Sequence, residues 1–303
     1  MGMSEYQYYE FQAIDRPLTE KEMDELRSYS TRARITPTNF VNEYSWGDFK
    51  GNADKWMERY FDAFLYVANW GTHMFKLRLP AKLLPTATAR QYCVGNTACA
   101  KEKDGKVIVS LTSENEEGGV WDEGENWLSS LIPIRAELAR GDLRALYLGW
   151  LLCAQNSELD ENVPEPPVPP NLTALSASLQ SLVDFLRISE DLLAVAAESS
   201  AKIQNGPVDR KKISAWVNRL PVTAKDEILV RLVIDGEAQI QNELLRRFEH
   251  DRKKNLTDSL ETRSPRRRSV AELLAAAEKR TEARLRAEAE RATETKQLPA
   301  KSR

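Results

Sequence analysis

Histidine is the scarcest of the residues that commonly carry chemistry in this chain. Only His73 and His250 occur among 303 residues, and neither belongs to a Cys-x-x-Cys or His-x-x-x-His pattern. Because zinc sites group several histidine or cysteine ligands at short spacing, the sequence predicts no metal site. His73 follows the alternation of Phe75 and Leu77 along a strand, so we expect a hydrogen-bonded sheet histidine. The alternative is a base that activates Cys93 or a serine.

Cysteines and long apolar runs are also scarce, and both absences bear on where the protein works. Cys93, Cys99 and Cys153 form an odd set without disulfide or zinc spacing, which is typical of a reduced cytoplasmic protein. No run of about 18 apolar residues and no basic-then-apolar leader occurs, so we expect no membrane span and a cytoplasmic location.

The common signatures of nucleotide binding and of a catalytic serine are absent as well. The chain contains no phosphate-binding loop, dinucleotide fingerprint or lipase-type nucleophile elbow. Gly118-Gly119 stands among acidic residues between Glu114 and Glu125, which would repel a phosphate. Those acids could take a divalent cation, but we favour a solvated loop. We therefore expect no cofactor, assign no catalytic residue and favour a protein without enzymatic activity.

The most distinctive segment that is present is the aromatic stretch from Asn39 to Leu79. It holds close to half of the aromatic residues of the chain, and aromatic side chains dominate the cores in which they pack. The spacing of Trp56, Tyr60 and Phe64 predicts a wide apolar helix face over residues 54–70, which Gly71 would end. We expect this stretch to form the main core.

The remaining patterns predict an α+β class for the N-terminal half. Thr19 and Glu22 have the spacing of a capping box at the start of a helix, and Asp104-Gly105 is a favourable hairpin turn. The order of elements favours a mixed sheet with covering helices. Strands are expected at 6–14, 35–46, 73–79, 98–103 and 107–111, and further helices at 125–139 and 142–155.

A proline-rich acidic segment, residues 156–171, divides the chain. Its five prolines and four acidic residues predict a stiff, extended linker. We expect an aromatic-rich α+β domain at 1–155 and a small all-α helical bundle at 172–250, followed by a basic flexible tail at 251–303. Within the bundle, one helix would carry its apolar stripe on Ile228, Leu229, Leu232 and Val233.

Charge is distributed unevenly along the chain. Residues 246–303 hold 17 Lys/Arg and 10 Asp/Glu, a net charge of +7, whereas the other residues hold 26 and 36, a net charge of −10. A basic tail on an acidic body either binds nucleic acid or folds back on the body. The final helix, from 270 to about 292, has few large apolar residues, so we expect it to be lone and solvated.

Two groups of residues are candidate sites. Tyr44, Trp46, Asp48 and His73 could line a pocket near the aromatic helix. Arg32 and Arg34, with Arg266, Arg267 and Arg268 of the tail, could contact the phosphates of a nucleic acid. Both interpretations compete with a simpler one, in which these side chains belong to the core or to an ordinary solvated surface.

The run from Tyr8-Tyr9-Glu10-Phe11 through Thr31 to Thr38 and on to Tyr44-Ser45-Trp46-Gly47-Asp48-Phe49 resembles the opening of uncharacterised bacterial proteins. The resemblance covers residues 6–80 and implies a bacterial origin and a recurring module, without an activity. We expect a non-catalytic interaction or regulatory subunit of a cytosolic assembly, with a protein partner. The alternatives are a nucleic-acid-binding accessory protein that uses the tail, and an enzyme with an unrecognised pocket.

Overall fold

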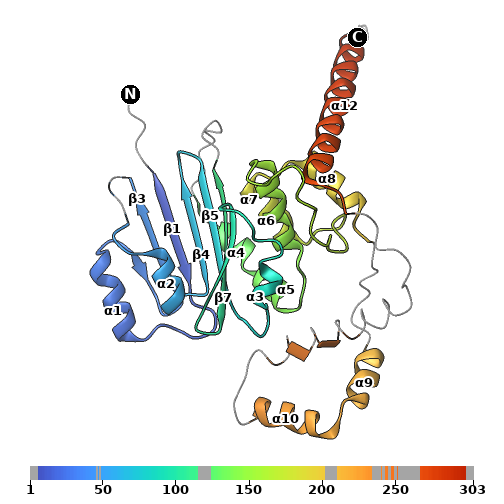
Figure 1. Ribbon diagram of the computed structural model, residues 1–303. Coiled ribbons are helices and arrows are strands. Elements are labelled where there is room, and N and C mark those ends of the chain that lie inside the picture. The colour runs from blue at the N-terminus through green and yellow to red at the C-terminus, as the bar shows by residue number, and fades with distance from the viewer. Residues whose placement is uncertain are drawn as a thin grey trace, which may run out of the picture.

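A seven-stranded sheet forms the centre of the protein in the computed structural model (Figure 1). The structure describes residues 6–45, 47, 49–114, 124–201, 210–233, 240, 243–244, 247–248, 251 and 267–297. The strand order is β2-β3-β1-β4-β5-β7-β6. The strands are β1 (Gln7–Gln12), β2 (Arg34–Ile35), β3 (Asn39–Tyr44), β4 (Ala63–Ala68), β5 (Thr72–Pro80), β6 (Ala98–Lys103) and β7 (Lys106–Glu114). Each pairing between them is antiparallel. The α+β class is confirmed, although the sheet is antiparallel where we expected a mixed one.

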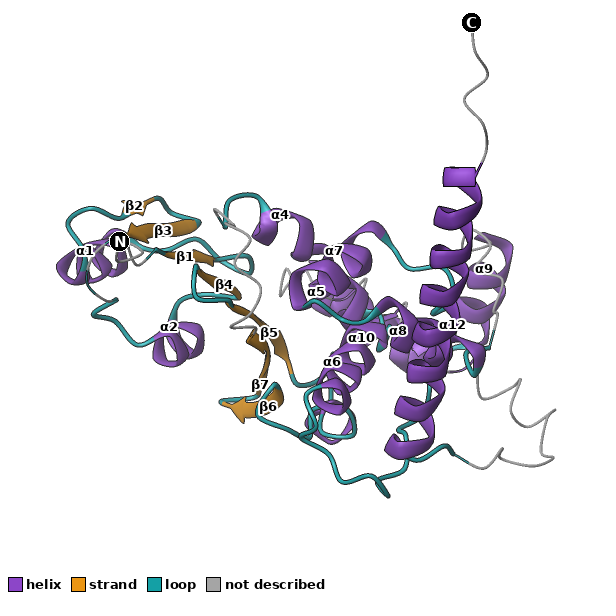
Figure 2. Cartoon of the chain, turned by 90° about the horizontal axis from the view of Figure 1, so that it is seen from above, coloured by secondary structure: helices purple, strands orange, loops and turns teal. Residues whose placement is uncertain are grey.

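Helices cover both faces of the sheet (Figure 2). Helices α1 (Glu20–Tyr29) and α2 (Ala53–Arg59) lie on one face, where Leu26 and Trp56 join a buried aromatic cluster with Phe11 and Phe64. The opposite face packs against the helices that follow the sheet in sequence. The other helices are α3 (Thr86–Ala89), α4 (Trp127–Leu131), α5 (Pro133–Ala139), α6 (Arg144–Gln155), α7 (Ala177–Leu186), α8 (Glu190–Glu198), α9 (Arg210–Arg219), α10 (Val222–Val233) and α12 (Val270–Gln297).

The long helix predicted over 54–70 is wrong. The chain forms the short helix α2 and then turns into strand β4, which pairs with β1 and β5. Both faces of this central strand are buried, because Phe64 lies in one apolar cluster and Leu65 in the other. A strand buried on both faces has a continuous apolar run, which periodicity alone does not separate from a buried helix. Gly71 lies in the turn between β4 and β5 rather than at a helix end.

Two local signals of the sequence are confirmed. Thr19 accepts a hydrogen bond from the backbone N–H of Glu22, and the Glu22 carboxylate accepts one from the Thr19 N–H, which completes the capping box of α1. Asp104 and Gly105 have φ values of 51° and 70° in the turn between β6 and β7. These positive angles are what a two-residue hairpin turn of this kind requires.

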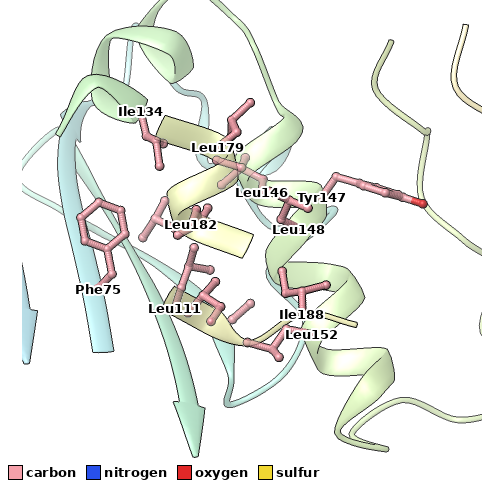
Figure 3. Packing of buried hydrophobic residues seen from close by; sticks show 14 of the residues in the cluster. Phe75, Leu111, Ile134, Leu146, Tyr147, Leu148, Leu152, Leu179, Leu182 and Ile188 are labelled. Carbon is pink, nitrogen blue, oxygen red and sulfur yellow. The ribbon is translucent and has the colours of Figure 1, made fainter. Parts of the chain in front are cut away.

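The buried core continues beyond the proline-rich segment. Leu179 and Leu182 of α7 lie among Phe75 and Leu111 of the sheet and Leu148 of α6 (Figure 3). Helices α7 and α8 therefore share the core of the sheet. The division of the chain into separate domains stays a prediction, because these contacts describe packing and not independent folding.

The final helix is not solvated along its whole length, which corrects the expectation of a lone helix. Val270, Leu273 and Ala277 near the start of α12 are buried, and Asp191 of α8 accepts a hydrogen bond from Thr281. Further along, Leu285 is exposed, and Figure 1 shows the later turns of α12 pointing away from the rest of the protein. The first half of α12 is docked on α8 and the second half projects.

Candidate functional site

The described members of the predicted pocket do not converge. Tyr44 lies opposite Gln7, and Gln7 lies opposite Ala68, so these three side chains share one face of the sheet. His73 lies opposite Val67, which is next to Ala68 in the strand, and therefore points to the other face. Tyr44 and His73 are on opposite sides of the sheet. Trp46 and Asp48 lie outside the described residues, and so does His250.

His73 is fully engaged in holding α7 to the sheet. Its Nδ1 lies 2.8 Å from the carbonyl oxygen of Phe185, and its Nε2 lies 2.9 Å from a guanidinium nitrogen of Arg187. Because a carbonyl only accepts and a guanidinium only donates, the ring is a neutral Nδ1–H tautomer. The ring also stacks on Phe185 at 4.7 Å between centroids. This is the hydrogen-bonded sheet histidine that the alternation predicted.

The cysteine–histidine alternative finds no support in the environment of the thiols. Cys93 and Cys153 are buried, and burial raises the pKa of each thiol to about 12. Nucleophilic and metal-binding chemistry needs the thiolate, which is strongly disfavoured at such a pKa. Within the described part of the chain, no group of three or more His, Cys, Asp or Glu side chains could hold a metal ion.

The candidate nucleic-acid residues have different surroundings. Arg32 and Arg34 are exposed at or near β2, which is an edge strand of the sheet. Arg267 is exposed just before α12, and Arg266 is outside the described residues. Arg268 does not face solvent freely, because it is committed to an internal ion pair. The structure therefore does not bring the described arginines together as one basic surface.

Arg268 pairs with a carboxylate that is almost completely buried. Its guanidinium donates two hydrogen bonds of 3.0 Å to Glu165, and it also donates to the carbonyl oxygen of Val195 at 2.9 Å. The Tyr147 hydroxyl donates to the same carboxylate. Burial and the neighbouring Glu165 charge raise the pKa of Tyr147, so the phenol keeps its proton. Glu165 also donates its backbone N–H to the Arg268 carbonyl, which ties the proline-rich segment to the start of α12.

A cavity of about 660 Å³ opens beside this ion pair, between α6, the segment after α3 and the proline-rich segment. Trp150 of α6 contributes to it, and Pro164, Pro166 and Pro167 supply part of its wall. Its polar lining consists of Gln91, Glu158, Asp160 and Arg267. We expected this segment to be an extended linker, so the cavity is a site that reasoning from the sequence missed.

A second unusual surface lies on α10. Five apolar side chains of this helix are exposed, with exposed fractions from 49% to 77%. They are Val222, Leu229, Val230, Leu232 and Val233, and we call them the α10 apolar surface. At 100° per residue, Val222, Leu229 and Val233 fall along the middle of one side of the helix. Leu229, Leu232 and Val233 were expected to be buried inside a helical bundle, and their exposure corrects that expectation.

The inner side of α10 is defined by different residues. Ala224, Ile228 and Arg231 are partly buried and follow the i, i+4, i+7 spacing of one helix face. Arg231 donates to the Glu243 carboxylate at 2.7 Å, and Trp216 of α9 packs edge-on against Phe248 with 5.6 Å between ring centroids. The Arg231–Glu243 ion pair engages the inner side of α10, opposite its apolar surface.

Comparisons with known proteins leave the function open. No protein-family model, no curated protein and no solved structure matches the chain. The resemblance of residues 6–80 to uncharacterised bacterial proteins therefore stays a prediction. Among the described helices, none is both long enough and apolar enough to cross a bilayer.

Proposed function

We propose that the protein is a non-catalytic interaction or regulatory subunit that binds a protein partner through the α10 apolar surface. The observation that carries the proposal is the exposure of five large apolar side chains on one helix, with Val233 exposed to 77% and Leu229 to 56%. Single exposed apolar residues are common on protein surfaces, but contiguous ones mark interaction sites.

The geometry of α10 suits a groove on a partner. An amphipathic helix binds such a groove through apolar anchors spaced three, four or seven residues apart, and Val222, Leu229 and Val233 have spacings of seven and four. Removing a leucine or valine side chain from water contributes about 1.5–3 kcal/mol, so a few such anchors supply a useful affinity.

The rest of the described chain supports a binding role more than a catalytic one. His73, which would be the base in the cysteine–histidine alternative, has its ring nitrogens occupied by Phe185 and Arg187. The buried thiols of Cys93 and Cys153 are held protonated at neutral pH. The tail also offers less free positive charge than its sequence suggests, because Arg268 pairs with Glu165 and Arg284 with Asp191.

Site-specific photo-crosslinking in the native cell tests the proposal. A photoreactive residue is placed at position 229 in one variant and at position 285 in a control. Leu229 and Leu285 are matched, since both are leucines on helices and their exposed fractions are 56% and 54%. We expect a discrete crosslinked protein from position 229 that is absent from position 285.

Nuclease treatment of half of each sample separates the alternatives. A crosslinked partner that survives nuclease supports the subunit proposal. Equal crosslinking from both positions, no product from either, or a product that is only a second copy of this chain contradicts it. Nucleic acid that is recovered with the protein and lost on shortening the chain at His250 would favour the accessory-protein alternative.

A further inference from the structure

The cavity beside the proline-rich segment has walls that are fixed before any ligand arrives. The Tyr92 hydroxyl donates to the carbonyl oxygen of Pro167 at 2.8 Å. Glu165 is held by Tyr147 and Arg268, and the Glu158 carboxylate accepts from the hydroxyl and backbone N–H of Thr97. A segment with this many prolines has little freedom to lose on binding. Walls of this kind favour a specific small-molecule site, because preorganisation lowers the cost of binding.

Three polar groups in the cavity contrast with these paired neighbours. The side chains of Gln91, Asp160 and Arg267 line it, yet they form no ion pair or side-chain hydrogen bond with the residues that the structure describes. Asp160 and Arg267 carry opposite charges in one cavity without touching each other. A ligand that carries both an ammonium and a carboxylate can pair with both, and such charge-assisted hydrogen bonds are stronger than neutral ones.

Most of the other residues that line the cavity are apolar, which suits a ligand with an apolar body. The rings of Pro164, Pro166 and Pro167 carry no N–H donor, and Val94 is exposed to 49%. Gln91 offers an amide that can both donate to and accept from a peptide group. The volume of about 660 Å³ lies within the range of about 300–1,000 Å³ that is typical of ligand sites. This volume is larger than a single amino acid needs.

We propose that this cavity binds a short apolar peptide of two or three residues with free ends. Its amino group lies at Asp160, its carboxylate at Arg267, and its side chains against the three prolines and Val94. The site is separate from the α10 apolar surface, so it does not depend on the proposed function.

Calorimetric titration of the full chain with three related probes tests the inference. The probes are the dipeptide Leu-Phe, its N-acetyl form without the ammonium charge, and its C-terminal amide without the carboxylate charge. The variants are Asp160→Asn and Arg267→Gln. Asp24→Asn and Arg32→Gln are the matched controls, because these residues are exposed, away from the cavity and unpaired within the described structure.

Each variant is expected to lose the preference for only one of the two ligand charges. Leu-Phe binds the unaltered protein, and loss of either ligand charge weakens binding by roughly tenfold or more. In Asp160→Asn the acetylated probe binds as well as Leu-Phe, and in Arg267→Gln the amide binds as well as Leu-Phe, because the lost charge no longer has a partner. The two control variants keep the affinity of the unaltered protein.

Three results would overturn the inference. One is the absence of binding at millimolar concentration for Leu-Phe and for a panel of apolar dipeptides and tripeptides. Another is equal affinity of the three probes for the unaltered protein. The third is an unchanged preference among the probes in both variants. Because Asp160 and Arg267 are exposed, we expect both variants to unfold at the temperature of the unaltered protein. Measuring that temperature for each variant separates a loss of binding from a loss of folding.

Discussion

Asp62 and Arg78 form an ion pair of 2.8 Å in which the side chains are only 1% and 5% exposed. Asp62 directly precedes β4 and Arg78 lies on the neighbouring β5. The carboxylate also accepts hydrogen bonds from the backbone N–H groups of Ile14 and Asp15, at 2.7 and 2.8 Å. Arg78 donates to the carbonyl oxygen of Glu58. The pair therefore joins β5 to the end of α2 and to the segment after β1.

Replacing Asp62 by Asn should destabilise the protein by about 3–5 kcal/mol, because Arg78 would be left as a buried charge without its counter-ion. Urea unfolding of the two proteins measures the difference. Glu22→Gln is the control, since Glu22 pairs with Arg16, whose side chain is half exposed, and exposed pairs contribute about 1 kcal/mol or less. Equal losses in the two variants would contradict the account of the buried pair.

The same carboxylate predicts a dependence of stability on pH. Burial opposes ionisation of Asp62, but Arg78 and the two backbone donors outweigh it. In the folded protein they lower the pKa of the Asp62 carboxyl below its ordinary value. The unfolded chain then binds more protons, so this contribution is complete above about pH 4 and is lost as pH falls through the folded pKa. We expect the free energy of unfolding to fall less steeply in acid for Asp62→Asn than for the unaltered protein. Parallel curves below pH 4 would refute this.

Two glycines with similar backbone angles should respond differently to substitution by alanine. Gly105 has a φ of 70° and nothing near its missing side chain, whereas Gly124 has a φ of 73° and a Cβ atom there would lie 2.8 Å from the Cβ of Tyr8. Gly105→Ala should cost only the left-handed strain of about 1–2 kcal/mol. Gly124→Ala adds a clash with a buried side chain and should cost clearly more in thermal unfolding. Equal costs would show that Gly124 does not pack against Tyr8.

Neighbouring arginines before α12 provide another matched pair. Arg268→Ala leaves the buried Glu165 carboxylate with Tyr147 alone, and we expect a loss of about 3–5 kcal/mol of stability. Hydrogen exchange should also quicken between Val270 and Arg284, where α12 is docked on α8. Arg267→Ala removes an exposed side chain and should change stability by less than about 0.5 kcal/mol. Equal exchange in both variants would mean that the ion pair does not hold α12.

Some features of the fold could be predicted because they depend on neighbouring residues. The Thr19–Glu22 capping box and the Asp104-Gly105 turn are formed by adjacent positions, and the alternation around His73 places its side chain on the buried face of β5. The helix expected across Phe64 could not be separated from a strand, because a segment buried on both faces shows no alternation.

The candidate sites depend on contacts that the sequence does not reveal. Arg268 is paired with Glu165, 103 residues earlier in the chain, so a residue expected to face nucleic acid is internal. The cavity forms because residues near Asp160 return to the segment after α3, which no local pattern indicates. Leu229 has the spacing of a core residue, and only the packing of α10 shows that it is exposed.

The most direct measurement of the proposed function is the amount of partner that copurifies from the native cell with Leu229→Asp, relative to Leu285→Asp. Both substitutions place a carboxylate on an exposed helical leucine and should leave unfolding unchanged. We predict that Leu229→Asp loses the partner by roughly tenfold or more, as expected for a buried apolar anchor of an interface, while Leu285→Asp keeps it. Equal recovery with the two variants would contradict the proposal that α10 binds the partner.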